Sequence, residues 1–199
     1  MRILLINNYR RSADSKIGKY EVALKSCFSS SRIETLSYRE LKVDAVLGVV
    51  DAYVLSGSSA SVCRRDTISE YSSVIELIRR ADAPILGICF GHQLIAYTFG
   101  APIRTEKLVR DVQEIEILES DEIFSCWKAG YKISMSEYHR DHVKRLPEGF
   151  ILLARSETCE IEAMKHESRP IYGVQFHPER SGRDGWTVLK NFFHGVVRR

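Results

Sequence analysis

Residues 84–94 constrain the fold of this chain more than any other segment, because they predict a buried strand that turns abruptly into a helix. The segment reads PILGICFGHQL and places Cys89 between Gly87 and Gly91. This Gly-x-Cys-x-Gly pattern is the cysteine form of a nucleophile elbow, in which small neighbours permit a strained turn at the carboxyl edge of a sheet. The following helix would point free N–H groups and its positive dipole end at the sulfur and favour the thiolate. A buried structural cysteine is the alternative that this segment alone leaves open.

A second segment, far along the chain, supplies the groups that a thiol nucleophile requires. Residues 171–176 predict a strand that runs into His177, Pro178 and Glu179. Proline favours extended backbone at the residue before it, and residues two apart in extended backbone project to the same side, so His177 and Glu179 should form one group. A thiol needs a base within reach, and the imidazole needs a carboxylate that fixes its tautomer. The two segments together predict a triad of Cys89, His177 and Glu179.

Strands and helices alternate through the first half of the chain. Strands are expected at 2–7, 32–36, 52–55 and 84–88, helices at 18–28, 66–80 and 91–99, β-rich segments at 112–118, 131–135, 150–153 and 160–164, and a closing helix at 186–196. Thr67 and Glu70 form a capping-box pattern at the start of the helix 66–80. The alternation predicts an α/β fold: a single doubly wound domain over residues 1–199, with a mostly parallel central sheet, helices on both faces and a β-rich C-terminal portion.

Composition is compatible with such a domain and argues against several classes of protein. A domain of 199 residues buries roughly 70% of its unfolded surface. The net charge of +3, with basic residues scattered among acids, does not predict nucleic-acid binding. The five cysteines are widely spaced and include no C-x-x-C pair, which argues against a disulfide framework. Because no apolar run reaches transmembrane length and no phosphate-binding glycine loop is present, we expect a cytoplasmic protein without membrane contact or a nucleotide site of its own.

The residues quoted so far carry a family resemblance. Segments 87–93 (GICFGHQ) and 173–179 (GVQFHPE) together resemble the class I glutamine amidotransferases. Segments 146–150 and 154–166 are similar to the glutaminase subunit of archaeal two-subunit GMP synthetases, so the resemblance covers most of residues 52–179. It implies a flavodoxin-like fold.

The resemblance also assigns roles to individual residues. It implies that Cys89 is the nucleophile, that His177 is the general base and acid, and that Glu179 orients His177. It further implies an oxyanion hole made of backbone N–H groups, and a site for the ends of the substrate. The oxyanion groups would come from Phe90 and the Gly57–Ser58 turn, and the substrate-binding residues would be Gln93, Tyr138 and His139.

The implied reaction is hydrolysis of L-glutamine to glutamate and ammonia through a γ-glutamyl thioester. Ammonia would pass to a separate synthetase, with the ATP-pyrophosphatase subunit of GMP synthetase as the expected partner and xanthosine monophosphate as the acceptor. ATP and Mg²⁺ are then expected on that partner, and no cofactor or metal is expected in this chain. We also expect partner docking to raise the rate of glutamine hydrolysis.

Several segments depart from the family pattern. Residues 6–11 (INNYRR) stand where the family has an Asp-Asn-Gly-Gly-Gln-like segment, and Ser58 stands where it usually has glycine. Tyr138 replaces the serine before His139, and residues 180–185 (RSGRDG) replace Val-x-His-Thr. The acceptor therefore stays open between GMP synthesis, a chorismate-using synthase and an imidazole glycerol phosphate synthase. A stand-alone γ-glutamyl hydrolase is a further alternative.

A zinc-binding protein and a non-catalytic binding relative are alternatives from other classes. Cys89 with His92, and His139 with His142, have the spacing of four zinc ligands. A zinc centre would leave the His-Pro-Glu segment without a purpose. A non-catalytic binding relative is opposed by the retention of all three triad residues.

Overall fold

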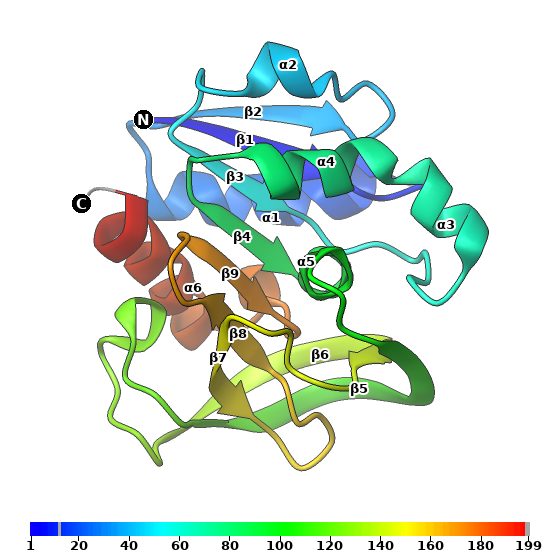
Figure 1. Ribbon diagram of the computed structural model, residues 1–199. Coiled ribbons are helices and arrows are strands. Elements are labelled where there is room, and N and C mark those ends of the chain that lie inside the picture. Colours follow the sequence, from blue (N-terminus) through cyan, green and yellow to red (C-terminus); the bar gives the residue numbers. More distant parts are fainter. Residues whose placement is uncertain (12, 198–199) are drawn as a thin grey trace.

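One mixed sheet of nine strands forms the centre of the computed structural model, which describes residues 1–11 and 13–197 (Figure 1). The strands are β1 (Arg2–Asn7), β2 (Arg32–Ser37), β3 (Ala52–Leu55), β4 (Ile85–Ile88), β5 (Ile103–Ile117), β6 (Lys132–Val143), β7 (Phe150–Arg155), β8 (Ala163–His166) and β9 (Ile171–Val174). Their order across the sheet is β2-β1-β3-β4-β9-β8-β7-β5-β6. Strands β2, β1, β3, β4 and β9 run parallel to one another. Strand β8 pairs antiparallel with β9, and β7, β5 and β6 continue the antiparallel half of the sheet. The predicted α/β class with a β-rich C-terminal portion is confirmed.

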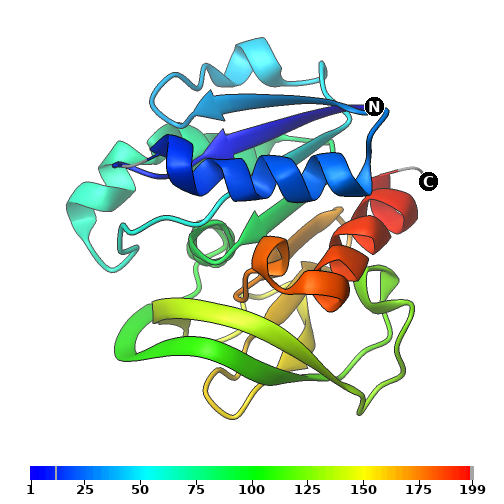
Figure 2. The ribbon, with the colours of Figure 1, turned by 180° about the vertical axis from the view of Figure 1, so that it is seen from behind.

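Helices cover both faces of the parallel half of the sheet. They are α1 (Ala13–Cys27), α2 (Val43–Val46), α3 (Arg65–Glu70), α4 (Ser72–Arg80), α5 (Phe90–Thr98) and α6 (Gly182–Asn191), with single turns at Glu122–Phe124 and Pro178–Arg180 and a π-helical end at Phe192–Val197. Figure 1 shows α4 and α5 in front of the sheet, and Figure 2 shows α1 and α6 on the opposite side. Each layer of helices buries its own hydrophobic core against the sheet.

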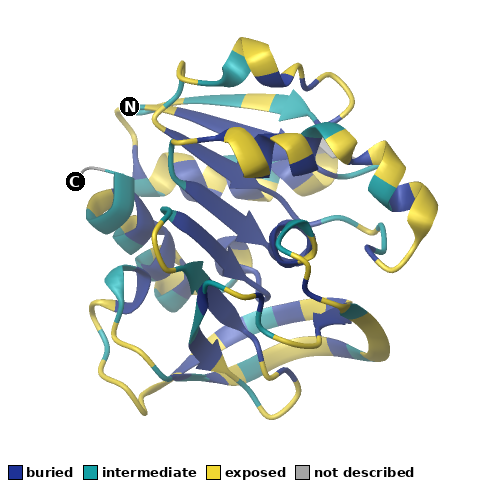
Figure 3. Ribbon diagram, viewed as in Figure 1, coloured by how far each residue is buried: buried dark blue, intermediate teal, exposed yellow. Residues whose placement is uncertain are grey.

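The central strands are buried on both faces, which explains their continuous apolar sequences. Every residue of β3, β4 and β9 is buried, as Figure 3 shows for the middle of the sheet. Runs of this kind are typical of parallel strands covered by helices on both sides. None of the described helices has both the length and the apolarity needed to cross a membrane.

The segment 66–80, predicted as one helix, forms two helices that meet at Tyr71. The prediction of a single continuous helix was therefore wrong. The backbone of Tyr71 (φ −99°, ψ 18°) departs from helical geometry between α3 and α4. Its ring is fully buried and stacks on Tyr38, and its hydroxyl donates to the Asn8 carbonyl. These tertiary contacts override the local pattern. The capping box is also absent, because Thr67 lies inside α3 and its hydroxyl accepts a hydrogen bond from Arg10.

The parallel strands bring four distant segments to one edge of the sheet. β1, β3, β4 and β9 all end there, so the residues that follow each strand are neighbours although they lie far apart in the sequence. In open α/β sheets this carboxyl edge is where ligands bind. The segments that meet are 8–11, 56–61, 89–93 and 175–180.

The turn from β4 into α5 requires glycine at two positions. A Cβ on Gly87 would lie 2.6 Å from the carbonyl of Gly91, and a Cβ on Gly91 would lie 2.5 Å from the Leu55 carbonyl oxygen. Contacts this short are repulsive, so α5 can approach β3 and β4 only where no side chain intervenes. The close approach places the first turn of α5 directly above the sheet edge.

We predict that Gly87→Ala lowers the free energy of unfolding by about 2 kcal/mol, since overpacking in a rigid region forces the backbone to shift. Gly18→Ala in α1 is the matched control, because a Cβ there has no atom within 4 Å. It should instead stabilise the protein by roughly 0.5–1 kcal/mol, since alanine loses less backbone entropy in a helix. Denaturant unfolding of both variants tests this, and equal effects of the two substitutions would contradict it.

Candidate active site

Cys89 occupies a strained position at the junction of β4 and α5. Its φ of 52° and ψ of −103° lie in a region that residues with side chains rarely adopt. The Cys89 N–H donates to the Val174 carbonyl at 2.8 Å, and the Cys89 carbonyl accepts from the Gln93 N–H at 3.0 Å. These two bonds fix the turn to β9 on one side and to α5 on the other. They hold the thiol at the carboxyl edge, with only 4% of the residue exposed.

His177 and Glu179 lie together directly after β9. His177 Nδ1 is 2.8 Å from Glu179 Oε1, and both side chains are almost completely buried. Residues 178–180 form one tight helical turn, and this turn brings the pair together. The extended backbone that we expected before Pro178 is not what places the two side chains next to each other. The His177 N–H donates to the Ser136 carbonyl of β6 at 2.9 Å, which fixes the position of the backbone.

The charge state of His177 follows from its neighbours. Burial alone would lower the pKa of His177, but the charges of Glu179 and Cys89 and hydrogen bonds to both raise it well above its ordinary value. His177 therefore contacts the sulfur on one side and the carboxylate on the other. The raised pKa favours the imidazolium form of His177. The structure thus brings the three predicted triad residues into contact.

Two cavities flank the triad and share part of one wall. A cavity of about 310 Å³ lies on the Cys89 side and is lined by Gln93, His139 and Asp141 among others. A cavity of about 370 Å³ lies on the side of His177 and Glu179 and is lined by Tyr9, Tyr20, Lys16, Lys19 and Arg180. Ser58, Ser59 and Tyr138 line both cavities. We call them the Cys89-side cavity and the His177-side cavity.

All three residues predicted to bind the substrate line the Cys89-side cavity, but two of them also bind protein groups. Gln93 Nε2 donates to the Asp141 carbonyl at 2.8 Å and to Gln175 Oε1 at 3.1 Å. His139 is buried, and its Nε2 is 3.1 Å from a carboxylate oxygen of Glu137. Tyr138 is 56% exposed, and its carbonyl oxygen is 3.9 Å from the Cys89 sulfur.

The oxyanion donors expected from residues 57 and 58 differ in their availability. The Gly57 N–H donates to the Tyr20 hydroxyl at 2.9 Å, so Gly57 is not a free donor and its predicted role needs correction. In the part of the chain that the structure describes, the N–H groups of Ser58 and Phe90 have no hydrogen-bond acceptor. Phe90 directly follows Cys89, and Ser58 lines both cavities beside it.

Asp141 is a site residue that the sequence interpretation did not single out. Its Oδ2 accepts from the Ser61 hydroxyl at 2.6 Å and from the Val62 N–H at 3.1 Å, and its Oδ1 accepts from the Thr105 hydroxyl at 2.6 Å. Asp141 thereby ties the segment after Ser58 to β5 and β6. One sequence signal could have identified Asp141. It lies two residues after His139, where the family's Ser-His-x-Asp pattern has its aspartate.

A pair of buried carboxyl groups beneath His139 was also missed. Glu137 and Glu162 are 2% and 0% exposed and lie close enough to affect each other's ionisation, and Glu162 accepts from the Ser156 hydroxyl at 2.6 Å. Burial raises the pKa of Glu137 to about 7 and that of Glu162 well above its ordinary value. The alternation of Ile133, Met135 and Glu137 along β6 could have revealed the inward direction of Glu137.

The four residues of the zinc alternative do not converge. His92 packs against Gly173, and burial lowers its pKa to about 3, so its ring is neutral. His139 and His142 contact each other edge to face, with ring centroids 4.7 Å apart, and Cys89 contacts His177. Among the described residues, no group of three or more His, Cys, Asp or Glu side chains is arranged to hold a metal ion. The geometry therefore does not fit the zinc reading.

We predict that Glu137→Gln flattens the pH dependence of stability. Between pH 4.5 and about 7 the folded protein keeps a proton on Glu137 that the unfolded chain releases, so stability falls as pH rises through this window. The amide cannot ionise, and the variant should avoid up to about 3 kcal/mol of that loss. Unfolding free energies measured across the window test this. Glu114→Gln, at an exposed position on β5, is the control, and parallel curves for wild type and Glu137→Gln would contradict the prediction.

Comparison with known proteins places this geometry in a family. The family model described as glutamine amidotransferase class-I matches residues 12–196. The chain is 36% identical over 198 residues to a glutamine-hydrolyzing GMP synthase subunit of Methanococcoides burtonii, an alignment that covers 97% of this chain and 95% of the relative. It is 52% identical over 123 residues to the protein of the same name from Thermococcus kodakarensis, covering 61% of this chain and 64% of that relative.

Solved structures show the same architecture. A Thermoplasma acidophilum protein provisionally assigned as the corresponding GMP synthase subunit superposes with a TM-score of 0.86 at 27% identity, over 100% of this chain and 94% of that chain. A Thermotoga maritima glutamine amidotransferase has a TM-score of 0.82 at 17% identity, over 100% and 99% of the two chains, and shows likeness of fold. The chain therefore belongs to the class I glutamine amidotransferase family.

Proposed function

We propose that this protein hydrolyses L-glutamine to glutamate and ammonia through the triad of Cys89, His177 and Glu179, and delivers the ammonia to a separate synthetase. The observation that carries the proposal is the buried His177, bonded to Glu179 at 2.8 Å and in contact with a strained cysteine at a helix start. This is the arrangement that nucleophilic acyl transfer requires.

In the proposed first step, the Cys89 thiolate attacks the δ-carbonyl carbon of glutamine and forms a tetrahedral oxyanion. The Phe90 and Ser58 N–H groups hold that oxygen, and each such donor typically contributes ~3 kcal/mol. His177 then protonates the amide nitrogen, which leaves as ammonia, and a γ-glutamyl thioester remains on Cys89. Glu179 stabilises the imidazolium before the proton is transferred.

In the second step, the neutral His177 takes a proton from water, which attacks the thioester. The C–S bond breaks, glutamate leaves, and the thiolate and imidazolium are restored. Glutamine would lie in the Cys89-side cavity, whereas ammonia would depart on the side of His177. The nitrogen must reach its acceptor before it is protonated by bulk solvent, because ammonium is not a nucleophile.

The proposed partner is the ATP-pyrophosphatase subunit of a GMP synthetase, with xanthosine monophosphate as the ammonia acceptor. The similarity to relatives named as glutamine-hydrolyzing GMP synthase subunits supports this choice. ATP and Mg²⁺ would then act on the partner. We place the reaction in the cytoplasm, where such a synthetase has its nucleotide substrates.

A stand-alone γ-glutamyl hydrolase is the second candidate, and the His177-side cavity favours it. A cavity of about 370 Å³ is larger than ammonia requires, and Lys16, Lys19 and Arg180 line it. An N-substituted γ-glutamyl amide with an acidic amine would fit its charge. Competition between such amides and glutamine would separate the two candidates.

We predict that Cys89→Ala abolishes ammonia release from glutamine, since it removes the nucleophile. Glu179→Gln should lower kcat at least about 100-fold, because the amide cannot stabilise the imidazolium. Cys63→Ala, at an exposed cysteine, is the control and should match wild type. The measurement is ammonia release with and without the ATP-pyrophosphatase subunit, ATP and xanthosine monophosphate.

That experiment tests the catalytic triad and the synthetase partner independently of each other. Activity of Cys89→Ala equal to that of wild type would refute the triad. A wild-type rate that the synthetase and its substrates leave unchanged would refute the partner and leave the glutaminase chemistry in place.

A further inference from the structure

The segment that carries the Ser58 N–H is held from two opposite sides by buried tyrosines. Tyr20 reaches it from α1 on one face of the sheet, and Tyr71 reaches it from the junction of α3 and α4 on the other. We define residues 56–60 as the oxyanion loop. Neither tyrosine belongs to the triad or to the predicted substrate-binding residues.

Tyr20 fixes the first half of the oxyanion loop. Its hydroxyl accepts the Gly57 N–H at 2.9 Å and lies 3.5 Å from His177 Nδ1. The fit is close, because a Cβ on Gly57 would lie 2.9 Å from that hydroxyl and 3.2 Å from the His177 ring. Tyr20 is 2% exposed, and burial raises the pKa of its hydroxyl well above the ordinary value, so the group stays protonated. One hydroxyl thus contacts both the loop and the catalytic base.

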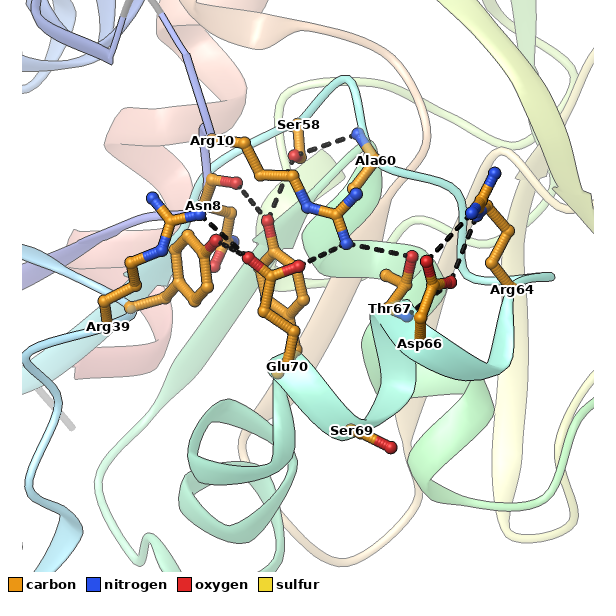
Figure 4. Close-up of polar contacts among 12 residues, drawn as sticks. Asn8, Arg10, Arg39, Ser58, Ala60, Arg64, Asp66, Thr67, Ser69 and Glu70 are labelled. Carbon is orange, nitrogen blue, oxygen red and sulfur yellow. Dashed lines mark hydrogen bonds and ion pairs between the residues drawn. The ribbon is translucent and has the colours of Figure 1, made fainter.

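Tyr71 fixes the second half. Its hydroxyl donates to the Asn8 carbonyl at 2.5 Å and lies 3.3 Å from Ser58 Oγ. Ser58 Oγ also accepts the Ala60 N–H at 3.1 Å, a contact that Figure 4 shows beside Asn8. Asn8 in turn binds Ser56 twice, through its N–H to Ser56 Oγ at 2.9 Å and through Nδ2 to the Ser56 carbonyl at 2.7 Å.

Tyr71 is itself held rigidly. Its ring is fully buried and stacks on Tyr38 with centroids 4.1 Å apart. The Tyr38 hydroxyl donates to Glu70, which pairs with both Arg10 and Arg39. Figure 4 shows the two arginines converging on Glu70. A side chain stacked and anchored in this way loses little further freedom when it binds the loop.

These contacts point to a specific purpose for serine at position 58. Glycine would leave the loop without its bonds to Tyr71 and to the Ala60 N–H. We propose that Tyr20 and Tyr71 are positioning residues, which hold the oxyanion loop from opposite faces so that the Ser58 N–H is aimed at the substrate oxygen before glutamine binds. The inference rests on the proposed glutamine hydrolysis and adds the residues that prepare its oxyanion hole.

The test compares Tyr20→Phe, Tyr71→Phe and the double variant with Tyr53→Phe. Tyr53 is a buried tyrosine of β3 whose hydroxyl donates to the Val46 carbonyl at 2.7 Å, so it loses one comparable bond without touching the loop. Each loop variant should lower kcat about 10-fold with KM changed less than about 2-fold, because the donor acts mainly on the transition state. Tyr53→Phe should keep the wild-type kcat while its melting temperature falls to a similar extent.

A second readout isolates the oxyanion hole. The glutamine analogue with an aldehyde in place of the γ-amide accepts the Cys89 sulfur at its carbonyl carbon, and the resulting thiohemiacetal oxygen occupies the place of the oxyanion. Its affinity should fall in parallel with kcat/KM in both loop variants, whereas the affinity for glutamate should stay within about 2-fold of wild type. A merely structural role of the tyrosines would not separate these two ligands.

Ser58→Ala shows which tyrosine acts through the serine hydroxyl. The loss from Tyr71→Phe should be smaller in the Ser58→Ala background than in wild type, whereas the loss from Tyr20→Phe should be the same in both. If the wild type hydrolyses glutamine and the loop variants behave like Tyr53→Phe, this inference is overturned and the proposed function stays intact. No glutamine hydrolysis by wild type would overturn the proposed function itself.

Discussion

The left-handed backbone of Cys89 is the constraint on which the rest of the site depends. A residue with a side chain at positive φ costs of order 1–3 kcal/mol and persists only where its surroundings enforce it. Here β9 accepts the Cys89 N–H, and α5 begins at the next residue because Gly87 and Gly91 let it approach. The bond to β9 has a second effect, because His177 lies in the segment that follows the same strand. The pairing of β4 with β9 therefore fixes the positions of Cys89 and His177 together.

Charge is distributed unequally among the buried ionisable groups of this region. His177 and Glu179 are buried with opposite charges side by side, so each offsets the desolvation of the other. Glu137 and Glu162 are two carboxyl groups in contact, and burial raises the pKa of both. The His177–Glu179 pair thus carries charge, whereas burial suppresses charge on the Glu137–Glu162 pair. This separation follows from which strands place which groups next to each other.

Two of the segments that depart from the family pattern, residues 6–11 and the segment with Ser58, are joined by hydrogen bonds. Asn8 comes from the segment after β1, and its backbone and side chain both bind Ser56. Ser58 stands at a position where the family usually has glycine, and its hydroxyl lies within hydrogen-bond distance of Tyr71. The chain therefore supports its oxyanion loop with side chains of its own, and substitutions that look separate in the sequence are physically coupled in the fold.

Local sequence patterns were sufficient to predict most strands and the grouping of Cys89 with His177 and Glu179, because apolar runs mark buried strands and glycines flank Cys89 at its turn. Only the tertiary structure decided what depends on distant contacts. It broke the helix at Tyr71, because burial and a bond to Asn8 outweigh helical periodicity. It also directed the Gly57 N–H to Tyr20, a pairing across two elements that no local pattern encodes.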